Sequence, residues 1–142
     1  MTNAFEVSKY LLMRGRELGI NDISPLKLQK LLFLSYELNA KYNKEPMFEG
    51  DFEVWRHGPV LRTIYNKFKK YGSEIIDETF EDKINVSKKD KEIINEALNN
   101  YGFLSAWSLV DKTHDVKGIW YSKMKLGEDI INFDDIIKLY EK

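Results

Sequence analysis

Asp111, His114 and Asp115 are the residues whose types and spacing come closest to a chemical site. Their separations of three and four would place them on one face of a helix, and carboxylates and imidazoles are common metal ligands. The chain holds only two histidines and no cysteine, so such a site would lack further strong ligands. The simpler interpretation is the polar end of a helix, where a cation is favoured. We prefer it and predict no metal ligands.

His57 is the other residue that could act as a base. It lies beside Gly58 and Pro59, and no serine of the chain sits in a nucleophile elbow. The sequence also lacks an HExxH motif, a P-loop and a GxGxxG motif. The absence of cysteine excludes thiol nucleophiles and disulfides and is compatible with a reducing cytoplasm. We therefore predict that the protein is not an enzyme, with no catalytic or cofactor-binding residues and no cofactor.

Charges are segregated along the middle of the chain. Those between Trp55 and Gly72 are all positive, and those from Glu74 to Asp82 are all negative. A basic helix over residues 59–71 could contact nucleic acid or an acidic protein. Alternatively, the neighbouring blocks neutralise each other on a solvated face. The chain has 22 Lys+Arg against 23 Asp+Glu and a formal charge of -1, which favours neutralisation and argues against a nucleic-acid partner.

One helix over about residues 24–43 is predicted to organise the fold. Ser24 can cap its start, and Pro25 suits the first helical position. Its middle is apolar nearly all round, which is typical of a helix buried on several sides. Lys27, Gln29 and Glu37 help to make it too polar to span a bilayer. With no signal peptide apparent, we expect a cytoplasmic protein without membrane contact.

The rest of the chain predicts further helices around this one. A length of 142 residues and a hydrophobic content of 43% indicate one globular domain, residues 1–142. Cap residues predict helices after Asn3, Ser87, Ser105 and Asn132, and a third helix is predicted to begin at Pro59. We therefore expect a compact, mainly α-helical fold, with at most a small β-hairpin or short strands around residues 51–55 and 75–86.

Three segments together resemble a known family. They are KLQKLLFLSYEL at residues 27–38, FEVWRHGPVLRTIYNKF at 52–68 and LVDKTHDVKGIW at 109–120. This combination is similar to the Panacea domain, the SocA-like and GepA-like antitoxin domain of bacteria and their prophages, and it spans essentially the whole chain. In the loop before Trp120 a proline is common in the family, and this chain has Lys117 to Ile119 there. We expect a structural role for these motif residues: Leu28, Gln29, Lys30, Leu31, Trp55, Gly58, Pro59, Thr113, His114 and Trp120.

The resemblance implies an antitoxin of a toxin-antitoxin system that neutralises a partner toxin by direct binding. It also leaves open an adaptor that delivers the toxin to a Clp-type protease, because one family member is similar to such an adaptor. A nucleic-acid-binding regulator that uses helix 59–71 is a further alternative. The resemblance supplies no catalytic residue, and the oligomeric state is open. We predict that Arg56, Arg62, Lys69 and Lys70 contact the partner, since they are expected to be exposed.

Overall fold

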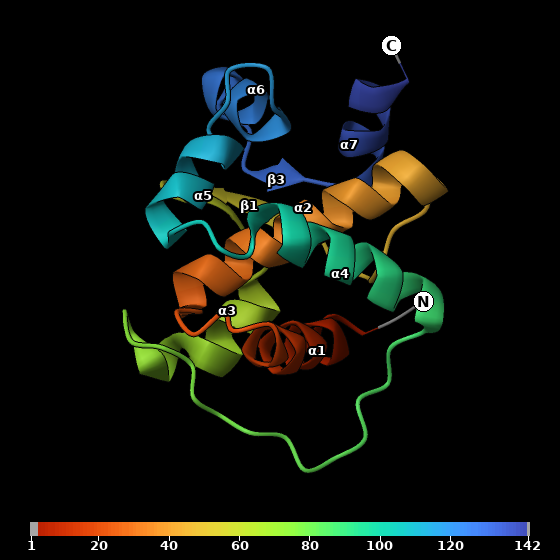
Figure 1. Ribbon diagram of the computed structural model, residues 1–142. Coiled ribbons are helices and arrows are strands. Elements are labelled where there is room, and N and C mark those ends of the chain that lie inside the picture. The colour runs from red at the N-terminus through yellow and green to blue at the C-terminus, as the bar shows by residue number, and fades with distance from the viewer. Residues whose placement is uncertain (1–2, 142) are drawn as a thin grey trace.

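Helix α2 (Pro25–Asn43) runs through the middle of the molecule (Figure 1). The computed structural model describes residues 3–141. Ser24 caps the helix by accepting a hydrogen bond from the Lys27 amide, and Lys44 ends it in the left-handed conformation with φ 57°. Leu28 and Leu31 in its middle are fully buried. The prediction of a buried central helix is therefore confirmed.

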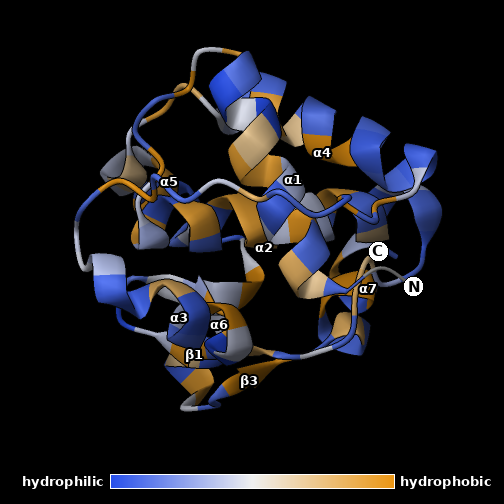
Figure 2. Cartoon of the chain, turned by 90° about the horizontal axis from the view of Figure 1, so that it is seen from below, coloured by the Kyte–Doolittle hydropathy of each residue, from blue (hydrophilic) through white to orange (hydrophobic). Residues whose placement is uncertain are grey.

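Most other helices pack against α2. Helix α4 crosses it, and α1, α3, α5 and α7 also contact it (Figure 1). Figure 2 shows that these helices carry hydrophobic residues on some faces and hydrophilic residues on others, as expected when apolar faces meet in one core. The helices of the described residues are α1 (Ala4–Glu17), α3 (Arg62–Phe68), α4 (Lys88–Tyr101), α5 (Ala106–Thr113), α6 (Ile119–Leu126) and α7 (Phe133–Tyr140), with a 3-10 turn η1 (Lys69–Tyr71).

The predicted cap residues begin their helices. Asn3 accepts a hydrogen bond from the Phe5 amide, and Ser87 and Ser105 accept from the amide three residues ahead. Asn132 and Asp135 form a reciprocal capping box at the start of α7. Helix α6 was not predicted, because Gly118 precedes it without a side-chain cap.

A three-stranded antiparallel sheet closes one side of the core. Its strands are β1 (Phe52–Trp55), β2 (Gly58–Val60) and β3 (Ile130–Ile131), in the order β2-β1-β3. Trp55 pairs with Gly58 across a two-residue turn, and Glu53 pairs with both Val60 and Ile130. The extended segment predicted at 51–55 is confirmed as β1.

The predicted start of the third helix at Pro59 is wrong. Pro59 lies in β2, and the helix begins only at Arg62. Proline suits an edge strand as well as a helix start, and pairing of Gly58–Val60 with β1 decides between them. The basic segment expected as helix 59–71 is therefore a strand, the short helix α3 and the turn η1.

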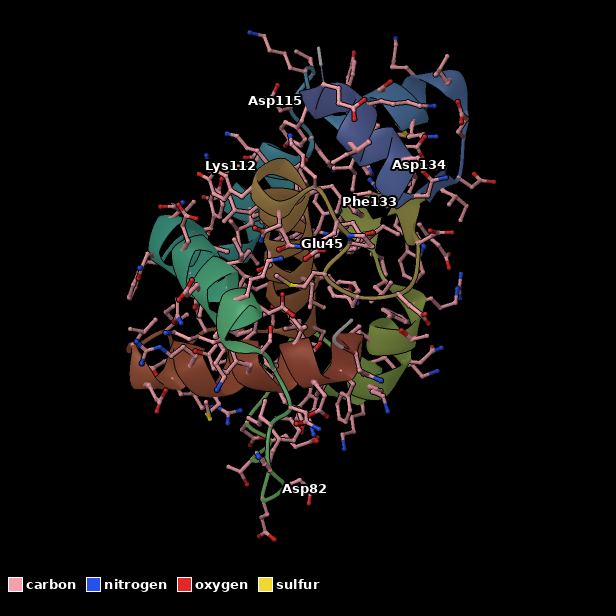
Figure 3. The ribbon with its side chains drawn as sticks, turned by 90° about the vertical axis from the view of Figure 1, so that its right-hand side faces the viewer. Glu45, Asp82, Lys112, Asp115, Phe133 and Asp134 are labelled. Atoms are coloured by element: carbon pink, nitrogen blue, oxygen red, sulfur yellow. The ribbon has the colours of Figure 1, made fainter. Side chains whose placement is uncertain are left out.

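Residues 75–86, where at most a small hairpin or short strands were expected, form no strand. This segment is an extended loop that passes beneath α1, and Asp82 projects from the body at its tip (Figures 1 and 3). Isolated hydrogen bonds help to hold it: the Ile76 amide donates to the Ile23 carbonyl at 2.9 Å, Arg16 donates to the Ile76 carbonyl at 3.0 Å, and the Asn85 amide donates to Glu6 Oε1 at 2.7 Å. Ile76 is buried. Its apolar side chain therefore anchors a loop and does not belong to a β-strand.

Among the helices of residues 3–141, none combines the length and the apolar character that a bilayer span requires.

Replacing Leu31 by alanine tests the central position of α2. Leu31 is 0% exposed, and its truncation should lower the free energy of unfolding by about 2–5 kcal/mol. Leu126 is 69% exposed, so the matched Leu126→Ala variant should stay within about 0.5 kcal/mol of the wild type. Urea unfolding followed by circular dichroism measures both, and equal losses would contradict this account of the core.

Candidate functional site

The turn between β1 and β2 is built around Gly58. Gly58 adopts φ +112°, a conformation that L residues rarely take. A Cβ atom there would lie 2.7 Å from Thr113 Oγ1 and 3.0 Å from Lys30 Nζ. Glycine therefore allows the turn to approach α2 and α5 closely.

Gln29 of α2 holds the chain where β2 leads into α3. Its Nε2 donates to the Leu61 carbonyl at 3.1 Å, and its Oε1 accepts from the Leu61 amide at 2.8 Å. The side-chain amide therefore pairs with Leu61 as a neighbouring strand would. Both partners are buried, and this pairing satisfies groups that would be costly to leave unpaired.

Lys30 reaches the same segment from the next position of α2. Its side chain is completely buried, and Nζ donates to the Pro59 carbonyl at 2.8 Å. The oxygen that it contacts is neutral, so the interaction brings no counter-charge into the core. Burial lowers the pKa of Lys30 from 10.5 to about 7, because a low dielectric disfavours the charged form.

Trp120 and His114 support the other arm of the hairpin. Trp120 Nε1 donates to the Trp55 carbonyl at 2.8 Å. The His114 ring stacks on the Trp120 ring, with centroids 3.8 Å apart and planes 15° apart. Burial, followed by the charge of Lys30, lowers the pKa of His114, while Asp111 and a hydrogen bond to the Arg56 backbone oppose that shift. We infer that the imidazole is neutral at pH 7.

The structure thus brings the motif residues of three segments to one hairpin. Side chains from α2, the end of α5 and α6 bind backbone groups at positions 55, 56, 59 and 61. The sequence predicted a structural role for Gln29 and Lys30 but not that their side chains bind the hairpin backbone. The available signal was a lysine and a glutamine beside leucines on a buried helix.

The metal-ion alternative finds no support in the geometry. Within residues 3–141, no group of three or more His, Cys, Asp or Glu side chains is placed to hold a metal ion. Asp115 Oδ1 instead accepts a hydrogen bond from the Lys117 amide at 2.9 Å, while His114 stacks on Trp120.

The four basic residues proposed for partner binding are all exposed, as expected: Arg56, Arg62, Lys69 and Lys70. Arg62 binds Glu53 through two hydrogen bonds of 2.7 and 2.8 Å, and its guanidinium lies 5.3 Å from the Trp55 ring centroid. Lys70 pairs with Glu78 at 3.6 Å, which partly neutralises the basic and acidic blocks. Their role in binding stays a prediction.

A pocket of about 280 Å³ opens beside this basic surface. Its apolar walls include Leu26 at the start of α2, Trp55 and Val60 of the hairpin, and Tyr65 of α3. Sequence reasoning missed this pocket because the walls come from three separate elements.

A second cleft of about 360 Å³ lies between α2, the α5–α6 connection and α7. Lys112 and Asp115, labelled in Figure 3, line it together with Glu37. Burial raises the pKa of Glu37 from 4.5 to about 7, against the opposing effects of a hydrogen bond with Tyr140 and the charge of Lys41.

Comparison with known proteins finds a match over the part of the chain that contains the hairpin and its supporting side chains. The family model "Antitoxin SocA-like, Panacea domain" matches residues 28–121. The chain belongs to this Panacea antitoxin family. A related protein is Antitoxin SocA of Caulobacter vibrioides (strain NA1000 / CB15N), with 31% identity over 129 residues, covering 83% of this chain and 68% of the relative. No solved structure matches. The Panacea match contains the hairpin and the side chains that bind its backbone.

Gly58→Ala tests the close approach of the β1–β2 turn to Lys30 and Thr113. Gly50 has a similar φ of +119°, but its added Cβ would meet only a flexible Leu61 methyl at 3.1 Å. Both alanine variants carry backbone strain, so we expect Gly58→Ala to destabilise the fold by about 2 kcal/mol more than Gly50→Ala. Thermal and urea unfolding measure the difference, and equal destabilisation would refute the proposed packing of Gly58 on Lys30 and Thr113.

The pH dependence of stability should have opposite slopes on either side of neutrality. Between pH 4.5 and about 7, folded Glu37 keeps a proton that the unfolded chain releases, so its contribution falls as pH rises. Between about 7 and 10.5, unfolded Lys30 holds a proton that the folded chain lacks, so its contribution rises with pH. Glu37→Gln should flatten the acid slope and Lys30→Met the alkaline slope in urea titrations. Unchanged slopes would contradict these assignments.

Proposed function

We propose that this protein is an antitoxin that neutralises a partner toxin by binding it directly. The observation that carries the proposal is the family match over residues 28–121, supported by a relative that is itself an antitoxin. The match covers a structural unit, because the segments that it joins meet at the β1–β2 hairpin. Neutralisation by binding needs a stable core and a complementary surface, without catalytic groups.

The geometry suits a binding module. Buried side chains fix the hairpin backbone, while Arg56 and His57 at its turn are exposed. A surface that is already ordered loses little conformational entropy when a partner docks. The motif residues therefore act as scaffold, and side chains on the outside of the hairpin and α3 contact the toxin.

Nucleic-acid regulation is a weaker proposal for this surface. The acidic block from Glu74 to Asp82 directly follows η1, and Glu78 binds both Lys70 and Tyr71. Phosphate groups would meet these carboxylates close to the basic residues, which opposes binding. Delivery to a protease requires the same direct toxin contact as its first step, and the fate of the bound toxin distinguishes it from inhibition.

Co-expression with the protein encoded beside this gene tests the proposed function. We expect that protein to arrest growth when expressed alone, this chain to restore growth, and the two to co-purify in a stable complex. An unchanged toxin half-life would indicate inhibition, and a shortened half-life that depends on a Clp-type protease would indicate delivery. Growth arrest that persists beside abundant, folded antitoxin, without a complex, would refute the proposal.

A further inference from the structure

We propose that the pocket between the start of α2, the β1–β2 turn and α3 is the toxin-docking site, and that it receives a bulky apolar side chain flanked by acidic residues. This inference rests on the proposed antitoxin function and adds the location of the contact and the chemistry of the toxin segment. We call this surface the hairpin pocket and define it by Leu26, Trp55, Arg56, Val60 and Tyr65.

The shape and lining of the hairpin pocket suit an apolar anchor. Its volume of about 280 Å³ can take one large side chain. The rings of Trp55 and Tyr65 meet edge to face with centroids 4.8 Å apart, and Tyr65 remains 36% exposed. Aromatic residues at the rim of an apolar pocket are typical of sites where a few contacts dominate binding.

Apolar surface continues beyond the pocket. The His57 ring, which lines the pocket, packs edge-on against Trp107 of α5 with centroids 5.0 Å apart. Trp107 is 58% exposed, so a large aromatic side chain flanks the turn on the side of α5. A partner segment that lies across the turn can therefore bury Trp107 as well as fill the pocket.

The charges around the pocket select an acidic partner. Arg56 lines it, and Lys69 lies in η1, just before Gly72 at the pocket wall. Both side chains are exposed, and neither forms an ion pair within the described residues 3–141. Arg62 packs its guanidinium over Trp55 and is already bound by Glu53. Arg56 at the pocket wall, and Lys69 three residues before the wall residue Gly72, thus have no ion-pair partner within the described residues. Asp or Glu side chains on the toxin would complement them.

The pocket is rigid because the groups behind it are buried and hydrogen-bonded. Gln29 binds both backbone groups of Leu61, Lys30 binds the Pro59 carbonyl, and Trp120 binds the Trp55 carbonyl. Trp55 is itself a wall residue, and Pro59 and Leu61 stand on either side of the wall residue Val60. A preorganised pocket of this kind favours one docking geometry.

A second copy of this chain is the principal rival occupant. Ile75 is 51% exposed and stands between Glu74 and Asp77, which gives it the same chemistry that the pocket selects. Ile75 is not among the residues that line the pocket. A contact between the two would therefore join different patches of two copies, head-to-tail, and would form rings or chains. We favour the toxin as the occupant, because a complex of one antitoxin with one toxin forms without the ring or chain of copies that head-to-tail self-association would require.

Two substitutions test the hairpin pocket against matched controls outside it. Leu26→Glu places a carboxylate at the pocket wall, in the first turn of α2, where the helix dipole favours an acid. Arg56→Glu reverses the charge at the rim. The controls are Val116→Glu at an exposed turn position and Lys88→Glu in the first turn of α4. Circular dichroism and unfolding first establish that all four variants are folded.

The readout is affinity for the toxin, measured by calorimetry with wild type in the same series. We expect Leu26→Glu and Arg56→Glu each to weaken binding by about tenfold or more, and both controls to stay within about twofold. Wild-type binding should also weaken as salt is raised, less steeply for Arg56→Glu. If wild type binds and the pocket variants bind equally well, the pocket assignment fails while the antitoxin function stands. If wild type does not bind, the proposed function fails first.

Photo-crosslinking identifies the occupant. A benzoylphenylalanine at position 65 should crosslink to a toxin peptide that carries a bulky apolar residue with Asp or Glu beside it. The same probe at position 116 should not crosslink to the toxin. A crosslink between two antitoxin chains at residues 74–77 would overturn the proposal in favour of self-association. A toxin peptide without acidic residues would overturn the proposed chemistry.

Discussion

The contact of Lys30 and Gln29 with the backbone of residues 59–61 is the constraint on which the rest of the structure depends. Two adjacent side chains of the central helix donate to the Pro59 and Leu61 carbonyls, and Gln29 also accepts from the Leu61 amide. These bonds hold β2 against α2, where residues 59–61 are buried. They hold Pro59 where β2 pairs with β1, and they bind Leu61, the residue just before α3.

The outer surface follows from that inner constraint. Because the backbone between Trp55 and Leu61 is held from behind, the side chains of Arg56 and His57 face away from the core at the turn. Trp120 reinforces the arrangement through the Trp55 carbonyl. The protein therefore separates two tasks in one short segment, with backbone groups bound by the scaffold and side chains available to a partner.

Two ionisable side chains of α2, the fully buried Lys30 and the half-buried Glu37, make this scaffold sensitive to pH. Lys30 lies behind the hairpin, and Glu37 lies about two turns later on α2, beside the second cleft. Burial disfavours the charge on each, which moves the pKa of both toward 7 from opposite sides. A neutral lysine can donate to a carbonyl without bringing an unpaired charge into the core. The hairpin support is thus compatible with burial near neutral pH.

The sequence by itself determined the helices that begin with a capping side chain, but not the starts of α3 and α6. The apolar pattern of residues 24–43 and the caps at Ser24, Ser87, Ser105 and Asn132 predicted elements that the structure contains, because capping and periodicity act between residues close in the chain. Only the tertiary structure decided that Pro59 is in a strand, that residues 75–86 form a loop, and that Ile130–Ile131 completes the sheet. The hairpin pocket was equally invisible, since its walls meet only when α2, the hairpin and α3 pack together. Pairing between distant segments leaves no signature in the local sequence. A short segment forms a strand or a loop according to the backbone groups that the fold places beside it.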